Sequence, residues 1–273
     1  MRQVEERYIS LLTDFGFKRI FGTAINKDLL ICFLNSLFDG KQVVKDVSYL
    51  NPEHVGDVYT DRKAIFDVYC EGENGEKFIV EMQNAYQTYF KDRSLFYSTF
   101  PIREQVALLN FDMNEEAFEK EKIRHSVQLC DTATHKVFYD KLELIYVEIA
   151  KFNKSLEELE TLYDKWLYAL KNLYKLTQRP KELCDKVFDR LFEEAEIAKF
   201  TPQELREYEA SKIAYRDIKN SVDTAKREGI AEGMEKKSHE IAKKMLTKGM
   251  DEATVMEITG LSAELIQQLK AEM

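Results

Sequence analysis

The spacing of apolar residues predicts a first third of the chain in which helices alternate with strands. Residues 13–22 are rich in aromatic side chains and read as a short helix opened by Thr13 or Asp14, since both residue types cap helix N-termini. Residues 26–38 carry apolar side chains at three- and four-residue spacing, which predicts a second helix. Residues 43–50 have the composition of a strand.

The alternation of apolar and polar positions is clearest in residues 63–83. Two runs, 63–71 and 77–83, alternate with a period of two, and the sequence Gly-Glu-Asn-Gly between them is typical of a turn. The pattern predicts a β-hairpin. In the second run Glu81 and Gln83 share one face of the strand.

After the hairpin the pattern becomes mostly helical. Residues 84–100 predict a helix that Pro101 stops or kinks. Further strands are predicted at 106–111, 125–131 and 141–150. Further helices are predicted at 156–177, 181–199 and 202–247, with two short helices inside 251–270 that separate at Thr259-Gly260.

Composition narrows the class of protein. The 273 residues carry a net charge of −9, and 10 glycines with 4 prolines favour long, uninterrupted helices. The 4 cysteines form no CxxC pair, which indicates core thiols in a reducing compartment. The chain shows neither the apolar core of a signal peptide nor a run long enough for a membrane helix, so we expect a soluble cytoplasmic protein. Because the chain is acidic, any contact with nucleic acid needs a local patch or a metal ion.

The hairpin brings two carboxylates together. A three-residue loop ending at Gly75, with Gly75 in the left-handed conformation, places Asp67 directly opposite Glu81. Opposed residues have Cβ atoms about 4.5–5.5 Å apart, so the two carboxylates repel unless one is protonated or a cation lies between them. With oxygen ligands the natural cation is Mg²⁺ or Mn²⁺, which can activate water and neutralise charge on a phosphate.

This arrangement resembles the Asp-x(n)-Glu-x-Lys motif of the PD-(D/E)XK phosphodiesterases. The segments LLTDFGFKRIFG, DLLICFLNSLF, DRKAIFDVYCEGENGEKFIVEMQ and FKDRSLFYSTFPIREQ follow one another in the order found in one branch of that superfamily. The later segment LELIYVEIAKF, the helix around Trp166 and the EGIAEG tail are also similar to it. Over nearly the whole chain, the sequence resembles the Rpn-type recombination-promoting nuclease and transposase family. The resemblance implies an α/β fold with a mixed sheet, a restriction-endonuclease-like core followed by a helical C-terminal region.

The resemblance also implies roles for residues of the hairpin. Asp67 and Glu81 would ligate the metal ion, and the backbone carbonyl of Met82 would add a third ligand. Gln83 stands where the family's motif usually has lysine. A glutamine can orient water or a phosphate, but it supplies no positive charge.

The missing charge therefore has to come from elsewhere in the chain. Lys63 is one candidate, because strand alternation puts it on the same side as Asp67, and Arg93 on the following helix is another. The superfamily often has a third acid on the first helix, which points to Asp14. The alternative for Asp14 is a helix cap that pairs with Lys18 four residues later.

The resemblance divides the chain into three parts. Residues 1–152 form the nuclease-like core, residues 153–200 a helical extension packed on it, and residues 201–273 a long helical arm with a small terminal unit like a helix-turn-helix. The sequence departs from the family pattern near 105–106, where a glycine-containing loop is expected and Gln105 instead leads directly into an apolar run.

Two functions remain open. The first is a metal-dependent DNA endonuclease linked to recombination or mobile elements. The alternative is a catalytically decayed member of the fold that binds DNA or another protein. The discriminating feature is the strand after residue 105: an intact four-stranded sheet there favours the enzyme, and a truncated or frayed sheet favours the binding module.

The C-terminal helices predict a role in contacts with DNA or with a second copy of the chain. A continuous helix over 202–247 would be about 69 Å long at 1.5 Å per residue. It carries no broad apolar stripe in its last part, and we expect it to break near Gly229, Gly233 or Gly249.

Overall fold

The protein is described by a computed structural model. The residues that the structure describes are 6–38, 40–50, 53–54, 64–65, 67–73, 75–85, 91–92, 95, 104–113 and 115–271. The chain divides into two compact units, Met1–Ile218 and Lys219–Met273.

Helices of the first unit begin where the sequence supplies capping residues. Thr13 caps α1 by accepting a hydrogen bond from the amide of Gly16, and Thr161 caps α4 in the same way through the amide of Asp164. Thr201 and Glu204 form a reciprocal pair of cap hydrogen bonds at the start of α6. The α-helices of this unit are α1 (Asp14–Phe21), α2 (Lys27–Phe38), α4 (Leu162–Asn172), α5 (Lys186–Glu194) and the first part of α6 (Pro202–Thr247). Short 3₁₀ helices lie at Ala24–Asn26, Ile149–Lys151, Leu156–Glu158, Leu173–Lys175, Lys181–Leu183 and Ile197–Lys199.

The strands form one mixed sheet and one small pair. They are β1 (Val47–Tyr49), β2 (Glu53–His54), β3 (Ala64–Ile65), β4 (Val68–Gly72), β5 (Lys77–Gln83), β6 (Glu104–Leu109), β7 (Arg124–Cys130) and β8 (Val137–Glu148). The larger sheet has the order β1-β4-β5-β6-β8-β7, and β2 pairs with β3. The β5, β6 and β8 strands run parallel, whereas β4 and β7 flank them as antiparallel neighbours. The predicted α/β class with a mixed sheet is confirmed.

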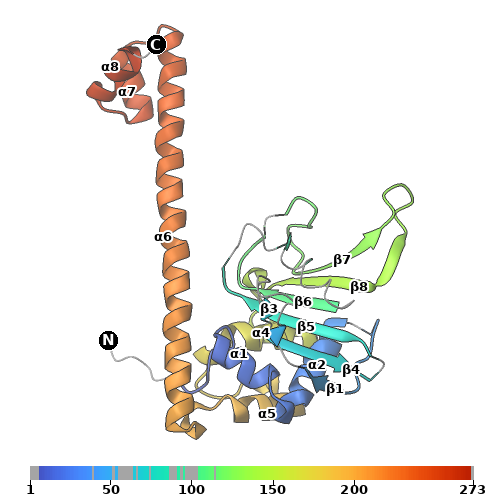
Figure 1. Ribbon diagram of the computed structural model, residues 1–273. Coiled ribbons are helices and arrows are strands. Elements are labelled where there is room, and N and C mark those ends of the chain that lie inside the picture. Colours follow the sequence, from blue (N-terminus) through green and yellow to red (C-terminus); the bar gives the residue numbers. More distant parts are fainter. Residues whose placement is uncertain are drawn as a thin grey trace. The chain divides into compact units, whose positions relative to one another are not determined.

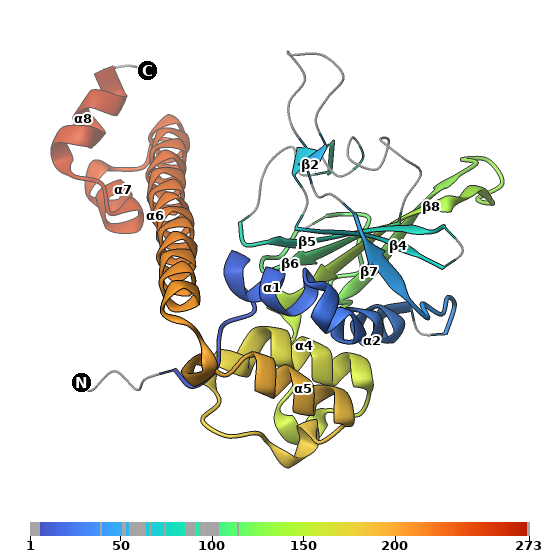
Figure 2. The same ribbon diagram turned by 60° about the horizontal axis from the view of Figure 1, so that its bottom comes forward.

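The main core lies between the sheet and the helices α1, α2, α4 and α5, which cover one face of the sheet (Figure 1 and Figure 2). Val80, Val106 and Val147 come from the three parallel strands and are fully buried there. Trp166 of α4 packs against Phe33 of α2 with a ring-centroid distance of 5.8 Å. Apolar burial of this extent is the dominant stabilising contribution to such a fold.

Several elements are shorter or more divided than the pattern of apolar residues predicts. The run 63–71 was predicted as one strand, but the structure divides it, because β3 pairs with β2 while β4 pairs with β1 and β5. The strand predicted at 43–50 is reduced to β1. Likewise, the helices predicted at 156–177 and 181–199 are shorter α-helices flanked by 3₁₀ turns, which leave more of the chain in turns than periodicity alone indicates.

The sheet is continuous at the point where the sequence departs from the family pattern. Six residues of β6, from Glu104 to Leu109, pair with β5 on one side and with β8 on the other. This strand is therefore paired along its length on both sides.

The second unit is built from three helices. The α6 helix continues through Gly229 and Gly233 without interruption and ends at Thr247, just before Gly249 with its positive φ of 79°. It is followed by α7 (Glu252–Thr259) and α8 (Ala263–Ala271), which Gly260 separates in the left-handed conformation. A small core joins the end of α6 to these two helices through Ala242, Met245, Val255, Ile266 and Leu269.

Among the described residues, no single helix has both the length and the apolar character needed to cross a membrane, although α1 and the helical segment Ala24–Phe38, bent by 64°, meet that test together. The apolar side chains of this pair are part of the buried core.

Candidate active site at the carboxyl edge of the sheet

The three parallel strands end at one edge of the sheet. Register pairs Gln83 of β5 with Leu109 of β6, and Leu109 with Glu148 of β8. Ligand and catalytic residues in α/β folds typically gather outside the carboxyl ends of parallel strands. We therefore expect the functional site at this edge of the sheet.

The hairpin register was predicted correctly. Val68 of β4 pairs with Val80 of β5, and extending this register by one residue brings Asp67 opposite Glu81. Gly75 has a φ of 86°, as the three-residue loop requires, because a residue with a Cβ atom is strained in that conformation.

A hydrogen bond fixes Asp67 against the neighbouring strand. Its Oδ2 atom accepts a hydrogen bond of 2.9 Å from the backbone amide of Met82, the residue that follows Glu81. The side chain of Asp67 is 24% exposed, while Glu81 is only 3% exposed. Two carboxylates on adjacent strands, one of them buried, form an oxygen-rich pair that attracts a cation.

The alternation of β5 decides which side chains face the site. Val80 and Met82 belong to the core beneath the helices, so Glu81 and Gln83 point to the opposite face of the sheet. Gln83 is half-buried. Glu81 and Gln83 are thus on one face, and Asp67 joins them through the register.

The first helix contributes a second carboxylate and a cation. The Nζ atom of Lys18 lies 2.7 Å from Oδ1 of Asp14, as expected for an i,i+4 pair, and 3.9 Å from Oδ1 of Asp67. The side chain of Asp14 is 65% exposed. Helical spacing predicts only the pairing of Lys18 with Asp14. The approach of Lys18 to Asp67 depends on the packing of α1 beside β4, which helical spacing does not reveal.

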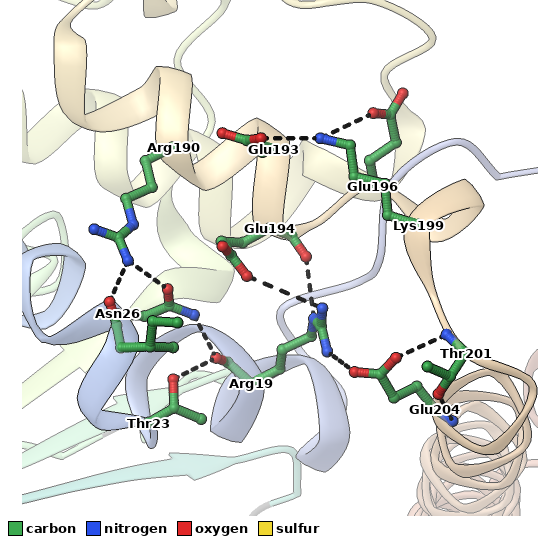
Figure 3. Close-up of polar contacts among 11 residues, drawn as sticks. Arg19, Thr23, Asn26, Arg190, Glu193, Glu194, Glu196, Lys199, Thr201 and Glu204 are labelled. Carbon is green, nitrogen blue, oxygen red and sulfur yellow. Dashed lines mark hydrogen bonds and ion pairs between the residues drawn. The ribbon is translucent and has the colours of Figure 1, made fainter.

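The position of α1 is held from its other side by Arg19. The guanidinium group donates a hydrogen bond of 3.1 Å to the backbone carbonyl of Glu194 and also bonds to the carboxylate of Glu204 at the start of α6 (Figure 3). The hydrogen bond from the backbone amide of Thr201 makes the largest contribution to lowering the pKa of the Glu204 carboxyl, and the hydrogen bond and positive charge of Arg19 lower it further. These contacts keep α1, and with it Lys18, in a fixed position.

The two cations proposed from the sequence, Lys63 and Arg93, lie outside the described residues. Within the described part of the chain, no group of three or more His, Cys, Asp or Glu side chains is arranged to hold a metal ion. The donor set at the hairpin is two carboxylates with nearby backbone and amide oxygens. This set suits Mg²⁺, which proteins commonly hold through one or two carboxylates and water.

A buried ionic network lies at the same edge of the sheet, two strands from Gln83. Glu148 is fully buried and accepts hydrogen bonds from the amide of Met113 at 2.7 Å and from Nε2 of His125 at 3.1 Å. The Nζ atom of Lys151 lies 2.7 Å from the second carboxylate oxygen of Glu148. Burial alone would lower the pKa of Lys151, but the hydrogen bond and charge of Glu148 outweigh it and raise the pKa. Residue spacing does not predict this network, because Met113 and His125 lie 35 and 23 positions from Glu148 in the chain.

The chain that follows Gln83 is also tied down. The amide of Asn110 donates a hydrogen bond of 2.9 Å to the carbonyl of Gln83, and the Asn84 side chain donates one of 2.9 Å to the carbonyl of Leu12. The side chain of Asn110 donates a bond of 3.1 Å to the hydroxyl of Tyr215 in α6. The end of β5 is therefore linked both to the segment before α1 and to the first part of α6.

Two family models match the chain. Residues 11–225 match the family described as PD-(D/E)XK nuclease family transposase, and residues 235–271 match the C-terminal HTH domain of the Rpn/YhgA-like nuclease family. No curated protein and no solved structure matches the chain. The first match covers well over half of the chain and contains the hairpin, the edge of the sheet and α1. The chain therefore belongs to the PD-(D/E)XK nuclease family of transposases and carries the C-terminal helix-turn-helix domain of the Rpn/YhgA-like nucleases.

Proposed function

We propose that the chain is a metal-dependent DNA endonuclease that hydrolyses phosphodiester bonds and acts in DNA recombination or in the movement of mobile elements. The observation that carries the proposal is the register that brings Asp67 opposite Glu81 at the carboxyl edge of the sheet. Nucleases of the PD-(D/E)XK family generally use divalent metal ions, and the helix-turn-helix domain suggests DNA as the partner.

In this proposal Asp67 and Glu81 hold Mg²⁺ or Mn²⁺, and the backbone carbonyl of Met82 adds a ligand. When bound, the ion supplies Lewis-acid chemistry, which activates water and neutralises charge on the phosphate. Gln83 orients the water or a phosphate oxygen through its amide. The hydrogen bond from the amide of Met82 keeps the carboxylate of Asp67 oriented toward the edge of the sheet.

The second candidate function is a binding module of the same fold without catalysis. Gln83 favours it, since the motif position that usually carries a lysine has no charge here. The intact pairing of β6 on both sides favours the enzyme, because a decayed core would be expected to lose that strand first.

Cleavage of covalently closed plasmid DNA tests the proposal, because a circle has no ends and only an endonuclease can open it. We expect nicked or linear plasmid with Mg²⁺ or Mn²⁺, no product with EDTA, and no product from Asp67→Asn. The matched control is Glu71→Gln, which removes a carboxylate from the same face of β4 at the other end of the hairpin, where it pairs with Lys77. The control should cleave like wild type. If wild-type protein leaves the plasmid closed with either ion, or if Asp67→Asn cleaves it equally well, the endonuclease proposal is wrong.

A further inference from the structure

The proposed active site has an imbalance of charge. Asp67 and Glu81 are acidic, the DNA phosphate is negative, and Gln83 contributes no charge where the motif usually supplies a lysine. Enzymes that transfer phosphoryl groups place cationic side chains against the phosphate oxygens, because charge on these oxygens must be stabilised in the transition state. Stabilising the phosphate charge at this edge of the sheet therefore requires an ammonium or guanidinium group from another element.

Lys18 of α1 is positioned to supply it. Its Nζ atom lies 3.9 Å from Oδ1 of Asp67, which is close enough for an ion pair but longer than a hydrogen bond. Its closer ion-pair partner is Asp14, at 2.7 Å. An ammonium group has three N–H donors, so the contact with Asp14 leaves donors that can turn toward a phosphate oxygen.

The side chain of Lys18 is also accessible to a substrate. It is 42% exposed, and its four-carbon stem allows the ammonium group to move by a few ångströms. The helix that carries it is fixed by the buried side chains of Phe17 and Ile20 and by the contacts of Arg19 with Glu194 and Glu204 (Figure 3). A flexible cation on a fixed helix can follow the phosphate without losing its place at the edge.

We propose that Lys18 is a catalytic residue that contacts a non-bridging oxygen of the scissile phosphate and so replaces the charge that Gln83 lacks. The inference rests on the proposed endonuclease function and adds a residue to its site. In the hydrolysis, a bond forms between the oxygen of water and phosphorus, and the ester P–O bond breaks. One proton of the water ends on the leaving hydroxyl and the other is released to solvent. Lys18 stabilises the charge on the phosphate oxygens throughout this step.

In this proposal Asp14 is a positioning residue that acts through Lys18. Its carboxylate holds the ammonium group of Lys18 at 2.7 Å and limits the directions in which the lysine can point. This assignment gives a specific part to the third acid that the family resemblance implies at Asp14.

The test compares Lys18→Gln, Lys18→Arg and Asp14→Asn in the full-length chain. Lys27→Gln is the matched control. Lys27 also lies 2.7 Å from an aspartate, Asp46, and is 45% exposed, close to the 42% of Lys18. An exposed ion pair of this kind contributes about 0–1 kcal/mol, so all four variants should fold like wild type.

Three measurements are made on each variant. With Mg²⁺, Lys18→Gln should lower kcat/KM for plasmid cleavage by about 10²–10³-fold, Lys18→Arg should recover part of the loss, and Lys27→Gln should have no effect. With Ca²⁺ and a short duplex, the slope of log Kd against log salt should fall by about 0.9 for Lys18→Gln, as expected when one phosphate contact is lost. The metal-induced rise in melting temperature should be retained or occur at lower Mg²⁺, because a cation near the metal ligands has been removed.

The outcomes separate the two proposals. If wild type cleaves and Lys18→Gln cleaves as well as Lys27→Gln, Lys18 has no catalytic role, while the endonuclease function stands. If Lys18→Gln loses cleavage together with the metal-induced shift, the lysine acts through the metal ligands and the phosphate contact is refuted. If wild type does not cleave with either ion, both proposals fail.

Discussion

The carboxylate of Asp67 and the backbone amide of Met82 are joined by a hydrogen bond of 2.9 Å between neighbouring strands. The bond gives Asp67 a structural contribution in addition to the proposed metal ligation. A substitution at Asp67 can therefore have two effects, the loss of a negative charge and the loss of a hydrogen-bond acceptor.

Substituting Asp67 with asparagine and with alanine should separate these effects. Met82 is only 8% exposed, so its amide loses an acceptor in Asp67→Ala, which should lower the free energy of unfolding by about 1–3 kcal/mol. Asp67→Asn keeps an oxygen that can accept the bond and should stay within about 1 kcal/mol of wild type. Urea unfolding at pH 7 measures both, and both variants should lose the Mg²⁺-induced rise in melting temperature. Equal stability of Asp67→Ala and wild type would mean that the hydrogen bond contributes nothing.

The buried network around Glu148 predicts a larger effect on stability. Glu148→Ala leaves Lys151, His125 and the amide of Met113 without their shared acceptor, and removing one partner of a buried ion pair costs about 3–5 kcal/mol. Glu148→Gln retains one acceptor oxygen and should cost less. Chemical denaturation followed by circular dichroism measures the difference. A cost below 1 kcal/mol for Glu148→Ala would show that water replaces the carboxylate at little expense.

The hairpin could be predicted from the sequence because its determinants are local. A period of two, a turn sequence and a glycine at the left-handed position are enough to set the register of Val68 against Val80. The division of the preceding run into β3 and β4 was not predicted. It depends on pairing with β2, and the partner strand Glu53–His54 is too short to be recognised from its sequence.

The contacts that complete the site could not be predicted for a related reason. Lys18 and Asp67 lie close together although they are 49 positions apart in the sequence. Lys151 and Glu148 are neighbours in the sequence, but the burial of Glu148 depends on the tertiary packing that also brings Met113 and His125 to it. Such contacts follow from tertiary packing, which residue spacing does not encode. The spacing of residues therefore predicts the carboxylates of one hairpin but not the cation that a neighbouring helix brings to them.

The cysteines predict a simple pattern of reactivity. Cys130 and Cys184 are exposed, whereas Cys70 is fully buried and burial raises the pKa of its thiol to about 12. At pH 8 the reactive thiolate of Cys70 is therefore scarcely populated. A thiol reagent such as dithionitrobenzoate should label Cys130 and Cys184 rapidly in the native protein and Cys70 only after unfolding. Rapid labelling of Cys70 in native protein would contradict its burial between the sheet and the helices.

Asp164, at the start of α4, makes the stability of the fold depend on pH. Burial raises the pKa of its carboxyl, but hydrogen bonds from Lys154 and Thr161 outweigh burial and lower the pKa overall. A carboxyl with a lowered folded-state pKa stabilises the fold above its unfolded pKa of about 3.9 and loses this contribution as the pH falls through the folded-state value. Asp164→Asn should therefore cost about 1 kcal/mol at pH 7, and the difference from wild type should shrink below pH 4. A difference that is constant from pH 7 to pH 3 would show that charge is not involved.

The division of the chain near the middle of α6 leads to the last prediction. The family match to the nuclease ends at residue 225, and the first part of α6 is anchored in the first unit by Tyr208, which is fully buried. The core of the second unit draws its buried residues from positions 242–269 alone. Deleting residues 226–273 should therefore leave the first unit folded, with an unchanged Mg²⁺-induced rise in melting temperature. It should weaken DNA binding by about tenfold or more, which corresponds to about 1.4 kcal/mol, because the helix-turn-helix domain is lost.

Gly260→Val should reproduce the loss of DNA binding in the full-length chain, since Gly260 has a φ of 70° that a β-branched residue does not adopt. Gly229→Ala is the control, because this glycine lies within α6 with open space around its Cβ position. Sedimentation and a gel-shift assay measure self-association and DNA binding, and a truncated chain that unfolds, or that equals full-length protein in both assays, would contradict an independent C-terminal binding unit.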